Sequence, residues 1–289
     1  MGISAEPGNN AGTIVIFTDF SNAALNATNY AVALAGQLNA SRLLICYSEH
    51  VPTTMEMSTQ SIRLTEQEHQ RCLKQLTTLQ DELQSRFNKR MVIETSIDQR
   101  PLDEIVNSYN QDQPAGLVVM GIAGKNQLER TFIGSNTIRV ARITAIPLLI
   151  VPEHTTFNVI EKVVFACDLK KVSQTTPALA IKRMVNKLGA KLSILNVDHN
   201  EERFNPDTIA EMTALHQLWD NEQPEYHYTD NEDIAKGVMD FADEHQMQMV
   251  IAVPKAYGFF ENLFHSSLTR KLAYHIHLPL LLFKEEKLK

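Results

Sequence analysis

Three glycines and the serine behind the last of them carry the clearest chemical signal in this sequence. They are Gly121, Gly124, Gly134 and Ser135, with two residues between the first pair of glycines and nine between the second pair. A short apolar run before Gly121 indicates a strand, and the residues after Ser135 indicate the start of a helix. Glycines in such a turn let backbone N–H groups approach an anion, and a helix N-terminus adds further N–H groups and a positive partial charge. The pattern therefore predicts a turn that holds phosphate groups.

A carboxylate stands where it can meet that turn. Asp19 follows the apolar, β-branched run of residues 13–18, which indicates a buried strand. In an open parallel sheet, ligands bind beyond the carboxyl ends of the strands at the point where the strand order reverses, and here the first and fourth strands should flank that point. The carboxylate can accept hydrogen bonds from a ribose hydroxyl or an adenine amine, but it cannot face phosphates without a metal ion. The alternative is a capping or turn role beside the helix that Ser21 opens.

Three polar residues near the glycines are further candidates. Ser135 and Asn136 directly follow Gly134, which favours phosphate contact, although both residue types also cap helices. Lys125 follows Gly124 and can approach a phosphate, although a single loop lysine is usually just solvated.

Strands alternate with helices along the whole chain. This order is typical of right-handed βαβ units and a parallel sheet. In the first half we expect strands at 13–18, 42–47, 91–97, 117–120 and 147–151, and helices from Ser21 and at 59–87, 102–109 and 136–142. In the second half we expect strands at 162–167, 191–197, 225–229, 249–253 and 279–283, and helices at 173–188, 206–219, 234–244 and 267–274.

The second half repeats the first. Residues 17–20 correspond to 166–169 at an offset of 149, and residues 147–149 correspond to 279–281 at an offset of 132. The second copy is therefore 17 residues shorter, where a long helix has a short counterpart. We expect two domains, residues 1–153 and 154–289.

The second copy has lost the glycines. At the offset of 132, Val253, Ala256 and Ser266 stand where the first copy has glycine, and Ser267 keeps the serine. A β-branched valine followed by Pro254 cannot form the same cradle. We therefore expect one working site, in the first copy, with the second copy as a structural partner.

Composition narrows the class of protein. The 289 residues carry a formal charge of −7, which argues against a general nucleic-acid or anionic-membrane surface. No stretch is long and apolar enough to span a bilayer, residues 1–12 lack the features of a secretion signal, and three widely spaced cysteines fit a reducing compartment. These features predict a cytoplasmic protein with no membrane and no nucleic-acid partner.

Catalytic and metal-binding patterns are weak by comparison. His275 and His277 could present two rings on one strand face, but no third ligand is evident, and we expect no metal site. The sequence contains no nucleophile elbow, no paired-histidine zinc motif and no lysine directly after a glycine loop. We assign no catalytic residue and expect binding rather than rapid turnover.

The combined motifs closely resemble the universal stress protein family. Residues 18–21, Thr-Asp-Phe-Ser, are similar to its first-strand signature, residues 120–136 match its G-x2-G-x9-G-[ST] motif in every glycine, and residues 147–151 are similar to its closing strand. The resemblance covers the chain as two tandem copies. It implies an α/β fold with two open five-stranded parallel sheets, Rossmann-like and similar to adenine nucleotide alpha hydrolases, with helices on both faces.

The resemblance also assigns a nucleotide site. It implies that adenine and ribose lie near four residues: Thr18, Asp19, Tyr47 and Met120. It implies that the phosphates contact three backbone positions and one hydroxyl: Gly121, Gly124, Gly134 and Ser135. Two residues depart from the family pattern, because Ala123 replaces a residue that is often basic or polar and Tyr47 is bulkier than the usual aliphatic side chain.

The implied function is a stress-response protein that binds ATP, AMP or another adenine nucleotide, with Mg²⁺ as a further component, and acts through an unidentified protein partner. The two copies would form a pseudo-dimer within one chain, and a homodimer of chains is open. Two alternatives remain: an interaction module that binds no nucleotide, and a slow ATPase or phosphotransferase with Asp19 as the acid.

Overall fold

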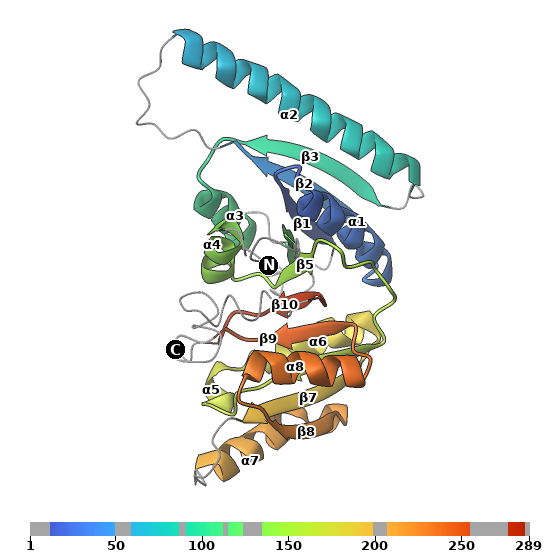
Figure 1. The fold of residues 1–289 in the computed structure, drawn as a ribbon, viewed down its shortest axis with the longest axis vertical. Coiled ribbons are helices and arrows are strands. Elements are labelled where there is room, and N and C mark those ends of the chain that lie inside the picture. The colour runs from blue at the N-terminus through green and yellow to red at the C-terminus, as the bar shows by residue number, and fades with distance from the viewer. Residues whose placement is uncertain are drawn as a thin grey trace, which may run out of the picture.

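A computed structural model describes residues 12–49, 59–86, 91–111, 115–123, 135–198, 207–254 and 277–286. It confirms the predicted α/β class, since strands and helices alternate and nearly every strand pair is parallel. Figure 1 shows the two halves of the chain stacked along the long axis, with the first half in blue to green and the second in yellow to red.

The first half contains a five-stranded parallel set in the order β3-β2-β1-β4-β5. The order reverses between β1 and β4, so the chain leaves both strands at the same edge of the sheet. The strands are β1 (Thr13–Thr18), β2 (Arg42–Ser48), β3 (Val92–Asp98), β4 (Leu117–Ile122) and β5 (Leu148–Pro152), and the helices are α1 (Asn22–Gln37), α2 (Thr59–Arg86), α3 (Leu102–Gln111) and α4 (Ser135–Ile143).

The second half repeats this order as β8-β7-β6-β9-β10. Its strands are β6 (Lys162–Ala166), β7 (Lys191–Asp198), β8 (Glu225–Asp230), β9 (Met249–Ala252) and β10 (Leu280–Leu282). Its helices are α5 (Val172–Thr175), α6 (Ala178–Leu188), α7 (Asp207–Trp219), the short 3-10 helix η1 (Asp220–Glu222) and α8 (Ile234–Glu244). The helix predicted at 267–274 lies outside the described residues.

One predicted helix of the second half is wrong in extent. We expected a single helix over 173–188, but the structure divides it into α5 and α6. Thr176 is extended, with ψ of 115°, because the ring of the following Pro177 disfavours a helical conformation at the residue before it.

The two parallel sets join into one ten-stranded sheet. Strands β5 and β10 pair antiparallel, with Leu149 opposite Leu281. The sequence predicted two separate sheets, whereas hydrogen bonds between these two strands make the sheet continuous. Both strands are fully buried, so a break between them would expose two apolar edges with unpaired backbone groups. The junction is what places the two copies against each other in Figure 1.

Alternating side chains of the sheet build two core layers. On β1, Ile14 belongs to the layer under α1, α2, α6 and α7, and Val15 belongs to the layer under α3, α4 and α8. Both layers run through both halves of the chain. This is the pattern of a parallel sheet covered by helices on both faces, which makes its central strands apolar throughout.

Helix α1 ties the segment that connects the two halves. The Asn26 side-chain amide donates to the carbonyl oxygens of Pro152 and Thr155, at 2.9 and 3.0 Å. The Gln37 amide donates to the carbonyl oxygens of Ile160 and Leu188, both at 2.8 Å, and its oxygen accepts the Ile160 N–H at 3.0 Å. Two amide side chains of the first copy thus fix the segment that leads from β5 to β6.

Candidate functional site

The strand order reverses between β1 and β4, and the candidate crevice is the region beyond the carboxyl ends of these two strands. Ile16 of β1 pairs with Val119 of β4, so two residues further on Thr18 and Gly121 stand at the same level of the sheet. Thr18 also pairs with Tyr47, the residue before the last of β2. The topology therefore brings the ends of these three strands together, as the sequence predicted.

The turn after β1 is held by its own side chains. The Thr18 hydroxyl accepts the Phe20 N–H at 3.1 Å, and one Asp19 carboxylate oxygen accepts the Ser21 N–H at 3.0 Å. Phe20 has a φ of 61°, in the left-handed region that a non-glycine residue adopts only under such support. The helix cap itself is Ser21, whose hydroxyl accepts the Ala24 N–H at 3.2 Å. Asp19 thus has a turn role, and it is exposed at the mouth of the crevice.

Gly121 has a structural reason to be glycine that requires no ligand. A Cβ atom at this position would overlap the Ala23 carbonyl group and lie 2.8 Å from the Ala24 nitrogen. The missing side chain allows the first turn of α1 to lie directly against β4. The backbone at the start of α1 is thereby brought next to Gly121, the first glycine of the motif.

Tyr47 lies beside the crevice on the α1–α2 face of the sheet. Its ring stacks on Phe20 with a centroid distance of 5.2 Å and an interplanar angle of 28°. Burial, followed by hydrogen bonding to Cys72, raises the pKa of Tyr47 to about 12, so the phenol stays protonated at neutral pH. Met120, by contrast, is buried in the layer under α3 and α4. The structure therefore separates these two predicted side chains onto opposite faces of the sheet.

The remaining predicted residues are only partly described. Ser135 and Asn136 are the first two residues of α4, and both are exposed, so their side chains are available at the helix N-terminus. Gly124, Lys125 and Gly134 lie outside the described residues.

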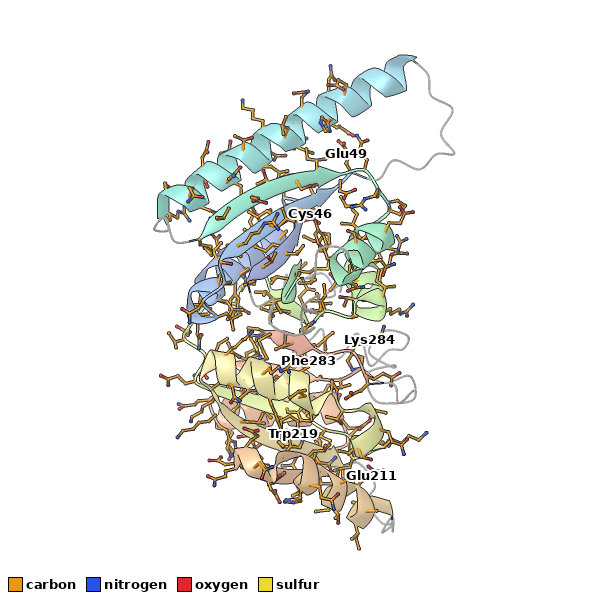
Figure 2. All side chains as sticks on the ribbon, turned by 180° about the vertical axis from the view of Figure 1, so that it is seen from behind. Cys46, Glu49, Glu211, Trp219, Phe283 and Lys284 are labelled. Atoms are coloured by element: carbon orange, nitrogen blue, oxygen red, sulfur yellow. The ribbon has the colours of Figure 1, made fainter. Side chains whose placement is uncertain are left out.

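Sequence reasoning missed a polar cluster next to Tyr47. Glu49 follows β2, and its side chain is only 8% exposed. One of its carboxylate oxygens lies 2.8 Å from His69 Nδ1 and 3.4 Å from Gln99 Nε2. The other is buried and has no hydrogen-bond partner within the described part of the chain. The hydrogen bond and the charge of Glu49 raise the pKa of His69. Glu49 is labelled in Figure 2. The cluster draws its three residues from separate segments, after β2, on α2 and after β3, so no local pattern could have revealed it.

The second copy preserves the turn but not the crevice chemistry. Leu169 has a φ of 50°, matching Phe20, and Asp168 accepts the Lys170 N–H at 3.2 Å, as Asp19 accepts that of Ser21. Val253, which replaces Gly121, is buried in the core. The repeat is therefore visible in backbone geometry where the residue types differ.

In the second copy, the backbone N–H groups that follow this turn donate hydrogen bonds to a carboxylate. Glu211 of α7, labelled in Figure 2, accepts the N–H groups of Lys171 and Val172 at 3.0 and 2.7 Å. These amides at the start of α5 are thus satisfied from within the protein. These two N–H groups are therefore already used by Glu211 and are not offered to a ligand anion.

The described part of the chain has no metal cluster and no helix of membrane-spanning character. There, no three histidine, cysteine or acidic side chains gather closely enough to hold a metal ion. No helix in that part has the length and apolar character to cross a membrane. Of the histidine pair that the sequence suggested, His277 Nε2 lies 2.6 Å from Asp243 Oδ1, and His275 lies outside the described residues.

Comparison with known proteins identifies the family. Residues 11–152 match the model of the universal stress protein family. The chain is 31% identical over 142 residues to a universal stress protein of Methanocaldococcus jannaschii, covering 48% of this chain and 80% of that protein. The chain therefore belongs to the universal stress protein family, as the glycine motif and the turn after β1 predicted.

Solved structures show the same fold over nearly the whole chain. A universal stress protein from Archaeoglobus fulgidus superposes with a TM-score of 0.68 and 15% identity, covering 95% of this chain and 98% of that one. A functionally unknown protein from Pseudomonas aeruginosa superposes with a TM-score of 0.57 and 12% identity, covering 94% and 92%. At these identities the likeness concerns the fold, and it extends through both halves.

Proposed function

We propose that this protein binds an adenine nucleotide, ATP above all, in the crevice between β1 and β4 of the first copy. The observation that carries the proposal is the parallel pairing of β1 with β4, which puts Asp19 and Gly121 at one edge of the sheet, with α4 as the next helix of the chain. A carboxylate, backbone amides and a helix N-terminus are the groups that ribose and phosphates require.

Each group has a distinct part in this proposal. Asp19 accepts a ribose hydroxyl with its exposed carboxylate, while the Thr18 and Tyr47 backbone lies beside the base. Backbone N–H groups at Gly121, Gly124 and Gly134, with the Ser135 hydroxyl, hold the phosphates, and Lys125 and Asn136 lie at the same turn. Mg²⁺ would be held mainly by phosphate oxygens and water, because Asp19 is assigned to the ribose and the described residues hold no cluster of three metal-ligating side chains.

The proposed role is a nucleotide-dependent switch in the stress response, acting in the cytoplasm through a protein partner. Turnover is secondary because Asp19 is exposed and engaged in its own turn, with no described base or orienting group against it. If a slow ATPase activity is present and Asp19 is its acid, Asp19→Asn should abolish it while retaining the turn hydrogen bond.

One observation favours an interaction module without nucleotide as the second candidate. The stacked Phe20 and Tyr47 rings lie at the β2 side of the crevice, where the base is expected. Mass spectrometry of the denatured, freshly purified protein separates the two candidates. A stoichiometric adenine nucleotide excludes the second candidate, and its absence together with no binding in titration excludes the first.

The direct test is a titration of labelled ATP against wild type and Gly124→Val. Gly124 is the better position for this test, because a side chain at Gly121 would move α1 even without a ligand. The matched control is Ala256→Val, which places the same valine side chain at the corresponding position of the second copy. The proposal predicts that only Gly124→Val loses affinity. Equal affinity of all three proteins would reject the site.

A further inference from the structure

A pocket of about 400 Å³ lies in the second half, remote from the proposed nucleotide crevice. It opens at the amino ends of β7 and β8, between the last turns of α6 and α7, whereas the crevice lies at carboxyl ends of strands. Val185, Leu192 and Trp219 give it an apolar floor. This volume is within the range of small-molecule sites in proteins.

The indole N–H of Trp219, at the floor of the pocket, lacks an acceptor among the described residues. The side chain is 0% exposed and packs against Phe165 with a centroid distance of 5.7 Å. Its indole N–H is buried without a hydrogen-bond partner among the described residues. The ammonium of Lys182, another pocket residue, lies 5.5 Å from the centroid of the indole ring. Figure 2 labels Trp219 between the sheet and the helices of the second half. A buried donor of this kind is costly, and an acceptor that reached it would relieve that cost.

The charged residues around the pocket are balanced. Lys182 pairs with Glu222 at 3.4 Å, and Lys191 and Glu225 stand at the starts of neighbouring strands. Two helices, α6 and α7, also end at the pocket, and their last carbonyl groups carry negative partial charge. The site therefore offers two kinds of contact: an acceptor can meet Lys182 and the Trp219 N–H, and a cation can lie near Glu225, whose carboxylate is 3.6 Å from His227 Nε2. A purely anionic ligand meets only the first.

We propose that this pocket binds a small zwitterion of the free amino-acid class. The ligand carboxylate approaches Lys182, displaces its ammonium from the indole face and accepts the Trp219 N–H. The ligand ammonium lies by Glu225 and the carbonyl ends of the helices, and an apolar side chain covers Val185 and Leu192. The site is independent of the nucleotide crevice.

Trp219 is the one tryptophan of the chain, so its fluorescence reports on this pocket directly. The experiment titrates the full-length protein with individual free L-amino acids and follows tryptophan emission. The proposal predicts a saturable change with at least one apolar amino acid, and a loss of that change with its N-acetyl and its amide derivative. The absence of a saturable change up to about 10 mM, roughly tenfold above the upper end of typical KM values, overturns the proposal. Undiminished binding of the N-acetyl derivative also overturns it, because the ligand would then be a simple carboxylate.

Two substitutions on α6 locate the binding. Lys182→Met keeps the aliphatic packing on the indole but removes the ammonium, and it should weaken the affinity about tenfold or more. Lys187→Met is the matched control, since Lys187 is exposed on the same helix outside the pocket lining, and it should leave affinity unchanged. Equal affinity of both variants contradicts the site. Nucleotide binding should be the same in both, so failure here is distinguishable from failure of the proposed function.

Discussion

At Gly121 one missing methyl group decides how close a helix can lie to the sheet. The glycine motif predicts a ligand turn, and the structure adds a packing requirement at its first position, because α1 backbone fills the space of a Cβ atom. Both requirements select glycine at the same residue. Stability and binding can therefore be separated only by comparing different glycines.

Gly121→Ala should destabilise the protein by about 2–3 kcal/mol, because α1 must move away from β4 to admit the new methyl group. Chemical denaturation monitored by circular dichroism measures this. Gly36→Ala is the control, because Gly36 is helical and the added Cβ would meet no described atom within 4 Å beyond its own helix backbone and chain neighbours. This variant should stabilise the protein by about 0.5–1 kcal/mol. A similar effect of both variants would contradict the packing assignment.

The Glu49–His69 pair should make stability depend on pH. Because Glu49 raises the pKa of His69 in the folded state, the stabilisation is fully present below the unfolded pKa of about 6.5 and is lost as pH rises through the folded pKa. His69→Gln should therefore cost more stability at about pH 6 than at about pH 9. The measurement is denaturant unfolding of wild type and variant at both values. If His69→Gln lowers the free energy of unfolding equally at both pH values, the pair does not act through protonation of His69.

Helix α1 contacts the candidate site and the connecting segment at both of its ends. Its cap residue, Ser21, closes the turn that presents Asp19, its first turn lies on Gly121, and its last turn carries Gln37. Most of this helix was predictable, because Ser21 and the apolar stripe that follows are local signals.

Ser21→Ala should cost about 1 kcal/mol of stability, because the Ala24 N–H loses its acceptor. The expected control is Ser85→Ala near the exposed end of α2, with an effect of less than about 0.5 kcal/mol. Thermal and denaturant unfolding of the two variants tests the cap. Indistinguishable stabilities would mean that the Ser21 hydroxyl contributes nothing to α1.

Elements were predictable where their signal is local. The strands of both halves and the turn after β1 follow from apolar runs and from Asp and Ser types at fixed positions. The break at Pro177 also had a local signal, which the helical periodicity around it outweighed. The Glu49 cluster and the Glu211 contacts had none, because their partners are brought together only by the fold.

At the scale of the whole molecule, the two copies act as one body through a shared sheet. The order of elements predicted two copies, but it carried no information on how they meet, since a buried apolar edge strand reads the same whether or not it is paired. The antiparallel junction of β5 and β10 and the amide contacts of α1 supply that missing part.

Gln37→Leu should weaken the connection between the copies. It leaves the Ile160 amide and two carbonyl groups without their partner, at an expected cost of about 2 kcal/mol. Denaturant unfolding measures the loss, and hydrogen exchange at residues 159–161 shows where it occurs. Gln70→Leu, on the exposed surface of α2, is the control and should be neutral. Unchanged hydrogen exchange at residues 159–161 in Gln37→Leu would show that the Gln37 hydrogen bonds do not stabilise this segment.

A crystal structure of the full chain grown with millimolar ATP tests the central claim most directly. The account predicts one nucleotide per chain, with its ribose at Asp19 and its phosphates at the glycine turn before α4. It also predicts an empty second crevice, because Glu211 already holds the amides there. Nucleotide in the second copy, with the first copy empty, would contradict the account.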